Sequence, residues 1–211
     1  MKKIDFKKEY KNLYLPSPKE VVVVDIPKMN FLTVDGHGDP NNSLEFQSAI
    51  EALYGIAFTL KFLFKKGEKP KHYFEFVVPP LEGLWWVDGE TFDPRKKDEW
   101  NWKLMIMQPP FITKAMVGDA ISQARQKKNS PAFDRVRFEP FHEGLCAQLM
   151  HIGPYSAEEK TIARIHEFIK KKGHKFRGKH HEIYTSDPRK VAPAKMKTVV
   201  RYPIVRSATR Q

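Results

Sequence analysis

The sequence predicts an α+β fold in which a strand-helix-strand-strand module occurs twice, with a ligand groove between the two halves. Three observations support this prediction. Strand patterns rich in β-branched residues alternate with helical patterns, the same order of elements returns in the second half, and Gly38 and Gly153 close equivalent turns. No low-complexity linker separates the halves, so we expect one domain over residues 1–211 with a pseudo-twofold axis between its modules.

The first module is predicted to span about residues 20–110. Residues 21–26 and 31–34 are short apolar runs that lead into a Gly-rich turn, which is typical of strands. Asn42 and Glu45 have the spacing of a capping box. Apolar residues then recur at helical intervals up to the glycine at position 67, on most sides of the helix, so we expect a long and largely buried helix.

Two more strands complete the first module, and a helix connects it to the second. Residues 71–78 and 100–108 carry strand patterns. Residues 113–128 have apolar positions on one helical face, which predicts a connecting helix, at about 111–130, that covers the sheet.

The second module, predicted at about 136–206, repeats the order of the first. Residues 145–152 form a strand pattern that ends in a Gly-Pro turn, and Ser156 to Glu159 has capping-box spacing for a helix that stops at Gly173. Two strand patterns follow, at residues 180–184 and 197–205. This repetition is the main reason to predict an internal duplication.

Glu182 is the main candidate for chemistry. Side chains alternate along a strand, so His180, Glu182 and Tyr184 face one side of the sheet and His181 faces the other. The position after the helix makes Glu75 the expected counterpart of Glu182 in the first module. Two interpretations of Glu182 remain open: it neutralises a neighbouring cation, or it is a partly desolvated carboxylate that acts as a counter-ion or as a general acid or base.

All four tryptophans lie between positions 85 and 102. Period-two spacing places Trp100 and Trp102 on one face, whereas the adjacent Trp85 and Trp86 point to opposite faces of a regular strand. Aromatic faces stack on planar ligands and attract cations, so these residues could line a ligand cage. Ordinary core packing is the alternative, and the sequence does not decide between the two for Trp85 and Trp102.

No metal or cofactor is expected. His180 and His181 face opposite sides of their strand, and the single cysteine, Cys146, excludes an intramolecular disulfide and a multi-thiolate zinc site. The Gly36-His37-Gly38 segment lacks the remaining residues of a phosphate-binding loop.

The net charge of +12 is unevenly placed. Residues 1–159 hold equal numbers of basic and acidic side chains, so the whole excess lies in residues 160–211. These cations are spread over elements with no nucleic-acid-binding motif, so we expect a solvated face and no nucleic-acid partner. No apolar run is long enough to span a membrane, and no secretory signal opens the sequence, so we expect a cytoplasmic protein.

Five segments together resemble stand-alone GyrI-like small-molecule-binding proteins. They are FLTVDGHGDPN at 31–41, ALYGIAFTLK at 52–61, PLEGLWW at 80–86, HIGPY at 151–155 and GKHHEIYTSDP at 178–188. Each motif is weak alone, but five in the same order are specific, and the resemblance covers residues of about 15–205. It implies the same pair of modules with a ligand groove between them.

The resemblance also implies a function. Related effector domains of multidrug-sensing transcription activators bind lipophilic cations through a buried acid and surrounding aromatic residues. A similar subfamily hydrolyses the cyclopropane rings of DNA-alkylating antibiotics, using an aromatic cage. By motif position, Glu182 looks like the acid, and the aromatic lining would come from Tyr54, Trp85, Trp102 and Tyr155.

We therefore predict binding of bulky planar or amphiphilic drugs with hydrolytic opening of a cyclopropane ring. Glu182 and Tyr155 are the expected catalytic residues. The expected ligand-binding residues are Tyr54, Trp85, Trp86, Trp102, His180 and Tyr184. The confinement of the positive charge to the segment that carries Glu182 favours a neutral planar ligand. A module that binds or senses such drugs without chemistry is the alternative.

Overall fold

A nine-stranded antiparallel sheet forms the centre of the computed structural model, which describes residues 3–64, 68–89, 96–128 and 130–206. Its main path runs in the order β1-β6-β9-β8-β3-β4-β2-β5, and β7 pairs with β9. The strands are β1 (Val22–Ile26), β2 (Met29–His37), β3 (Leu81–Trp86), β4 (Asn101–Gln108), β5 (Arg137–Phe141), β6 (Gly144–Ile152), β7 (His174–Phe176), β8 (His180–Tyr184) and β9 (Lys197–Arg206).

Five α-helices and four short 3₁₀ segments accompany the strands within the described residues. The helices are α1 (Phe6–Glu9), α2 (Lys11–Tyr14), α3 (Leu44–Leu63), α4 (Lys114–Lys127) and α5 (Glu159–Lys171); the 3₁₀ segments are Lys97–Glu99, Pro131–Arg135, Tyr155–Ala157 and Pro193–Lys195. No helix in this part of the chain combines the length and the apolar character that crossing a membrane requires.

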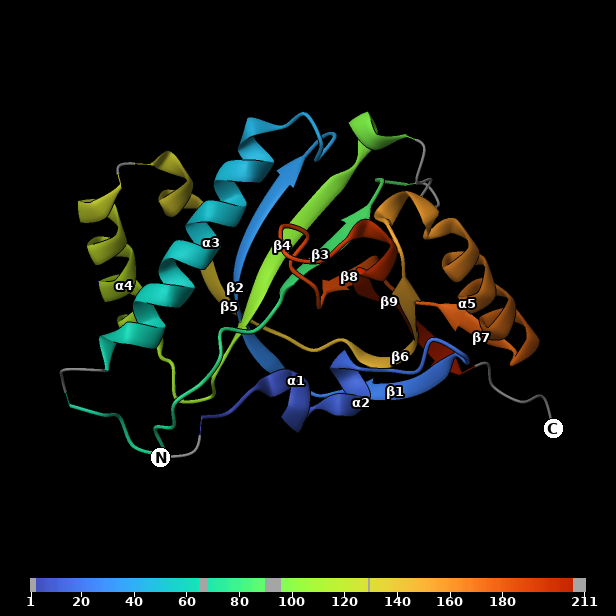
Figure 1. Ribbon diagram of the computed structural model, residues 1–211, viewed down its shortest axis with the longest axis horizontal. Helices are drawn as coiled ribbons and strands as arrows, with labels where there is room; N and C mark the ends of the chain where they lie inside the picture. Colours follow the sequence, from blue (N-terminus) through green and yellow to red (C-terminus); the bar gives the residue numbers. More distant parts are fainter. Residues whose placement is uncertain (1–2, 65–67, 90–95, 129, 207–211) are drawn as a thin grey trace.

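The predicted duplication is confirmed. The order β2-α3-β3-β4 in the first half matches β6-α5-β8-β9 in the second, and the halves meet where β3 pairs with β8. Figure 1 shows α3 and α5 over opposite halves of the sheet, with β3 and β8 between them. In the register of this pair Gly83 lies opposite Glu182, so Glu182 lies where the two modules join.

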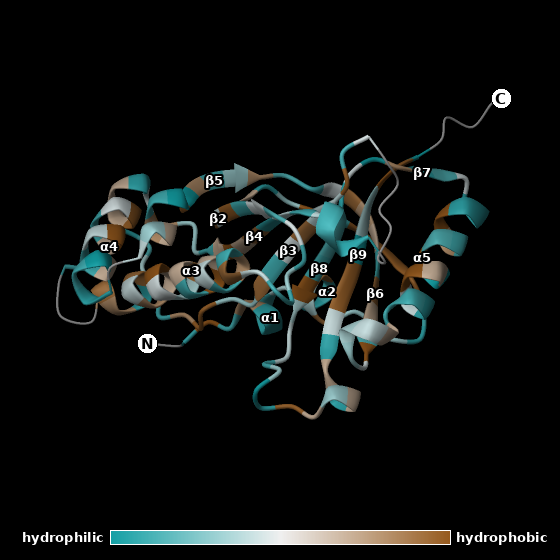
Figure 2. Ribbon diagram, turned by 90° about the horizontal axis from the view of Figure 1, so that it is seen from above, coloured by the Kyte–Doolittle hydropathy of each residue, from teal (hydrophilic) through white to brown (hydrophobic). Residues whose placement is uncertain are grey.

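Each face of the sheet has its own apolar cover. On one face, α3 packs on β2 and β4, and α5 packs on β6 and β9. On the other, Leu13 and Tyr14 of α2 join a separate cluster with residues of β1, β6, β8 and β9. Figure 2 shows hydrophobic residues along the central strands and mostly hydrophilic ones on the outer turns of α5. The predicted connecting helix is confirmed as α4, but it packs mainly on α3 instead of on the sheet.

The predicted strand at 71–78 is wrong. Only Phe76 of this segment pairs with another backbone, through one bridge to Ile4. Its aromatic residues instead pack around Phe111, with ring centroids 5.1 to 6.1 Å away, so their alternation serves a loop-borne core cluster. The strand of the module is β3, and Glu75 is therefore not the counterpart of Glu182.

Both predicted capping boxes are also wrong. Ser43, not Asn42, caps α3 by accepting a hydrogen bond from the Phe46 backbone amide at 3.1 Å. Ser156 belongs to a 3₁₀ turn, and Glu158 occupies the N-cap position of α5 without a side-chain capping bond. The side chain of Glu158 is therefore available for another contact.

Candidate active site

Glu182 lies in the middle of β8, on the sheet face that α3 and α5 cover. Its neighbour across the β3–β8 pair is Gly83, and a glycine is needed there because a β-carbon would lie 2.9 Å from Trp85 Nε1 and 3.2 Å from the Tyr184 hydroxyl. The missing side chain thus leaves room for an indole and a phenol beside the carboxylate. About 15% of the Glu182 side chain stays exposed.

Two residues of the same strand face bind Glu182. His180 Nε2 lies 2.8 Å from one carboxylate oxygen, and the Tyr184 hydroxyl donates to the other at 2.8 Å. Burial alone would raise the pKa of Glu182, but the hydrogen bonds from His180, Tyr184 and Glu158 outweigh it and lower the pKa. The predicted grouping of His180, Glu182 and Tyr184 is therefore what the structure contains, and Glu182 is ionised at neutral pH.

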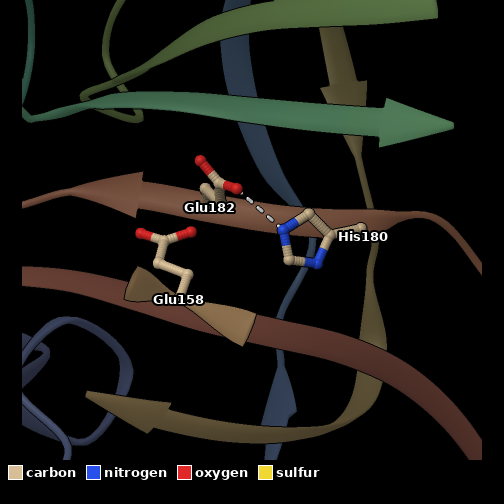
Figure 3. Close-up of side chains that lie close together, drawn as sticks. All are labelled: Glu158, His180 and Glu182. Carbon is tan, nitrogen blue, oxygen red and sulfur yellow. Dashed lines mark hydrogen bonds and ion pairs between the residues drawn. The ribbon is translucent and has the colours of Figure 1, made fainter. Parts of the chain in front are cut away.

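A second carboxyl group completes this cluster. Glu158 occupies the N-cap of α5, keeps only 4% of its surface exposed and lies beside Glu182, with one carboxyl oxygen of each within 4.8 Å of the other (Figure 3). Burial and the charge of Glu182 raise the pKa of Glu158 far above its ordinary value. One carboxyl is thus protonated and the other ionised.

Glu158 was not among the residues predicted from the sequence, because its place at the start of a helix pattern made it look like part of a capping box. Neighbouring Ser156 supplied the apparent cap. One feature of the sequence indicates its position: Glu158 follows the HIGPY motif, three positions after Tyr155, the last residue of that motif.

Tyrosines border the two carboxyls. Tyr155 packs edge-on against Tyr184 with ring centroids 5.5 Å apart, and 42% of its surface is exposed. Burial, followed by the charges of Glu182 and Glu158, raises the pKa of Tyr155 to about 12. Tyr202, which sequence analysis did not select, packs on His180 at 5.0 Å between centroids. These phenols stay neutral donors at physiological pH.

Tyr54 stands at the edge of the group. It lies on α3, packs on Phe58 with ring centroids 6.2 Å apart and interacts electrostatically with Tyr155. Burial raises the pKa of Tyr54, so its hydroxyl also stays protonated.

The three tryptophans that were predicted to bind the ligand occupy three different environments. Trp85 is 3% exposed and packs between Phe46 and Trp100, with its indole nitrogen near Gly83 and so close to Glu182. Trp102 is fully buried in the core. Trp86 points to the reverse face, where the Lys179 ammonium lies 3.0 Å from the centroid of its ring. Only Trp85 adjoins the carboxyl cluster.

Glu158, His180 and Glu182 also form a potential metal-ligand set. One donor atom from each lies within 4.8 Å of the others (Figure 3). Carboxylate oxygens and an imidazole nitrogen suit divalent transition metals. The expectation of no metal stays a prediction, since the sequence pattern behind it did not include Glu158.

A hollow of about 410 Å³ lies on the reverse face of the sheet, away from Glu182. Leu84 and Met105 are part of its lining, and Lys103, Arg177 and Lys179 contribute positive charge. The ligand groove expected at Glu182 therefore remains a prediction.

Comparisons with known proteins agree with this fold. The model of the GyrI-like small molecule binding domain matches residues 19–205. An uncharacterized conserved protein of Listeria innocua is 46% identical over 96% of this chain and all of its own, with a TM-score of 0.88. Two structures named hydrolases, also from Listeria innocua, are 44% and 43% identical over 97% and 96% of this chain and all of theirs, with TM-scores of 0.87 and 0.85.

A distant match shows the fold alone. The C-terminal domain of EcmrR is 13% identical over 89% of this chain and 98% of its own, with a TM-score of 0.56. No curated protein matches the chain.

Proposed function

Because the chain belongs to the GyrI-like small-molecule-binding family, we propose that it binds bulky planar molecules beside Glu182 and hydrolyses a strained cyclopropane ring in them. The observation that carries this proposal is the partly exposed Glu182 carboxylate, which is hydrogen-bonded by His180 and Tyr184 and bordered by the Tyr155 ring. The two similar Listeria structures named hydrolases support a reaction of this class.

The surroundings of Glu182 favour a flat and neutral ligand. Tyr155 and Tyr184 present aromatic surface, and the indole of Trp85 lies next to them. The excess positive charge in residues 160–211 opposes binding of a lipophilic cation. A planar drug with a cyclopropane conjugated to a carbonyl group fits these conditions.

Glu182 and Tyr155 would have different catalytic roles, as base and as hydrogen-bond donor. Glu182 would accept a proton from a water molecule as its oxygen attacks the ring, and the Tyr155 hydroxyl would donate a hydrogen bond to the carbonyl oxygen where negative charge develops. General base assistance of this kind contributes about 10²–10⁴-fold in rate. Ring strain in the substrate supplies further driving force. Such turnover would remove alkylating drugs before they react with DNA.

The test is to incubate the purified protein with a cyclopropane-containing alkylator and to follow the ring-opened product by mass spectrometry. We expect Glu182→Gln to lower turnover by about 10²–10⁴-fold, because an amide does not accept the proton. Glu167→Gln, an exposed change on α5, serves as the control and should act as wild type.

The same experiment separates the alternative function. Saturable quenching of tryptophan fluorescence without ring-opened product would identify a module that binds the drug and does no chemistry. Equal turnover by wild type and Glu182→Gln would contradict the role of this carboxylate.

A further inference from the structure

We propose that Glu158 is a second catalytic group, which shares one proton with Glu182 and gives that proton to the substrate. This inference rests on the proposed function, since it describes the same site. In it, Glu182 is the base that takes a proton from water, and Glu158 is the acid that protonates the oxygen on which negative charge accumulates.

The positions of the two carboxyls carry the inference. They come from neighbouring elements of the second module, the N-cap of α5 and strand β8, and one carboxyl oxygen of each lies within 4.8 Å of the other. Two carboxylates this close, one of them buried, repel each other, so the protonated form of one of them is favoured. Among the ion pairs of the described residues, none joins either group to a lysine or arginine that would remove this need.

The unequal environments assign the roles. Glu182 accepts hydrogen bonds from His180 and Tyr184, which stabilise its ionised form. Glu158 is 96% buried, and its Oε1 atom has no hydrogen-bond partner within the described part of the chain. The protonated form of Glu158 is therefore favoured, and its unpartnered oxygen is the atom that a bound ligand could approach.

The reaction balances without a cofactor. A carbon–oxygen bond forms between water and the ring carbon while one carbon–carbon bond of the cyclopropane breaks. The electron pair of the broken bond moves through the conjugated system to the carbonyl oxygen, which takes the proton of Glu158. Glu182 takes the proton released by the water.

The proximity of the two carboxyls then allows the starting state to be restored. After the reaction Glu182 is protonated and Glu158 is ionised. Transfer of one proton from Glu182 to Glu158 returns both groups to their first forms, so the net change is the addition of one water molecule to the substrate.

Other titratable groups face the pair from each neighbouring element. They are His180 and Tyr184 on β8, Tyr155 in the 3₁₀ turn before α5, Tyr202 on β9 and Tyr54 on α3. The tyrosines stay neutral to high pH, since burial raises the pKa of each. Loss of the Glu158 proton is thus the change we expect on the alkaline side.

The first experiment detects the shared proton without any substrate. Infrared spectra of the whole protein at pH 7 should contain the C=O stretch of a protonated carboxyl, sensitive to exchange into D₂O. Glu158→Gln should remove this band, because an amide keeps the shape and can donate to Glu182 but has no acid proton. Glu159→Gln, the exposed neighbour at the start of α5, is the matched control and should keep it.

The second experiment measures turnover and binding. Glu158→Gln should bind the alkylator with a dissociation constant within about threefold of wild type, yet open the ring about 10²–10⁴-fold more slowly. Wild type should lose activity on the alkaline side of its pH profile as Glu158 ionises, and the residual activity of Glu158→Gln should lack this limb.

The outcomes separate the two proposals. Absence of the carboxyl band in wild type, or full turnover by Glu158→Gln, would overturn the role of Glu158. If wild type showed the band but opened no ring, the proposed ring-opening function and the acid role would both fail, and the proton-sharing pair would stand. A band that Glu158→Gln removes, together with slow turnover and unchanged binding, would support the inference.

Discussion

Strand β8 carries a histidine–carboxylate cluster on each face, and the two clusters differ in charge balance. On the face toward α3 and α5, Glu182 and Glu158 neighbour His180 and neutral tyrosine side chains. On the reverse face, His181 lies between two buried carboxylates, 3.1 Å from Glu82 and 2.9 Å from Glu143. Adjacent residues of β8 thus lie in two different electrostatic environments.

The reverse-face cluster is electrically balanced. Arg201 binds Glu143 at 3.1 Å, the side-chain oxygen of Gln148 at 2.9 Å and the carbonyl of Leu13 at 2.8 Å. Two carboxylates therefore face two cations, because the charges of Glu143 and Glu82 raise the pKa of His181 against the effect of its burial. The bond from Arg201 to Leu13 also ties α2 to the sheet.

The comparison indicates how one sheet separates stability from reactivity. A buried carboxylate with a guanidinium and an imidazolium around it is held in its ionised form and has no proton to give. Glu158, whose neighbours among the described residues include a second carboxyl but no ion-paired lysine or arginine, is favoured in its protonated form. We infer that the reverse face maintains the position of β8, whereas the other face uses that position for chemistry.

The largest expected effect is on the reverse face. Arg201→Leu leaves Glu143 buried without its strongest cation, and breaking such a pair costs about 3–5 kcal/mol of unfolding free energy. Urea unfolding at pH 7 measures this loss. Arg206→Leu, an exposed change on the same strand, is the control and should stay within about 0.5 kcal/mol of wild type.

A double variant keeps this prediction testable if Arg201→Leu does not fold. Replacing both Arg201 and Glu143 by leucine removes the uncompensated charge, so it should recover part of the lost stability. A stable Arg201→Leu single variant would show that the reverse-face cluster does not hold the fold together.

Much of the fold was predictable, because the duplicated order of elements follows from local patterns. The predicted strand at 180–184 and the connecting helix agree with β8 and α4. The exception is 71–78, where aromatic residues alternate as in a strand but pack around Phe111 in a loop. Period-two spacing does not distinguish pairing with another strand from packing in an aromatic cluster.

Of the candidate site, only the residues that come from one strand, β8, could be predicted from the sequence. The spacing of His180, Glu182 and Tyr184 placed them on one face, because alternation along a strand is a local property. Glu158 approaches from another element, and the burial that gives it its proton depends on tertiary packing. The depth of Trp102 in the core is likewise a property of the whole fold.

Acid should weaken the reverse-face cluster selectively. Burial alone would raise the pKa of Glu143, but the charges of His181 and Arg201 lower it to about 2. A carboxyl with a lowered pKa adds stability above its unfolded pKa of about 4.3 and loses that stability as pH falls toward 2. The shift corresponds to about 3 kcal/mol, which wild type should lose between pH 5 and pH 2.

Glu143→Gln should lack this part of the acid dependence, although it is less stable than wild type at pH 7. Urea unfolding at several pH values measures both slopes, with the exposed change Glu159→Gln as the control. Parallel slopes for wild type and Glu143→Gln would contradict the assignment of a strongly lowered pKa to Glu143.

The smallest effects come from removing one phenol hydroxyl on each face. Tyr14 donates to Glu82 at 3.1 Å on the reverse face, and Tyr184 donates to Glu182 at 2.8 Å on the other. Glu82 is 2% exposed, so Tyr14→Phe leaves a buried carboxylate with one donor fewer and should cost about 2 kcal/mol of unfolding free energy.

Tyr184→Phe should cost less than about 1 kcal/mol, because Glu182 keeps its other partners and some contact with water. Its effect should fall on turnover instead. Loss of a donor raises the pKa of Glu182, so the acid limb of the pH profile for ring opening should move to higher pH, whereas Tyr14→Phe should leave that limb in place. If the two variants lost equal stability, or if Tyr14→Phe moved the acid limb, the faces of β8 would not have the separate roles inferred from their charges.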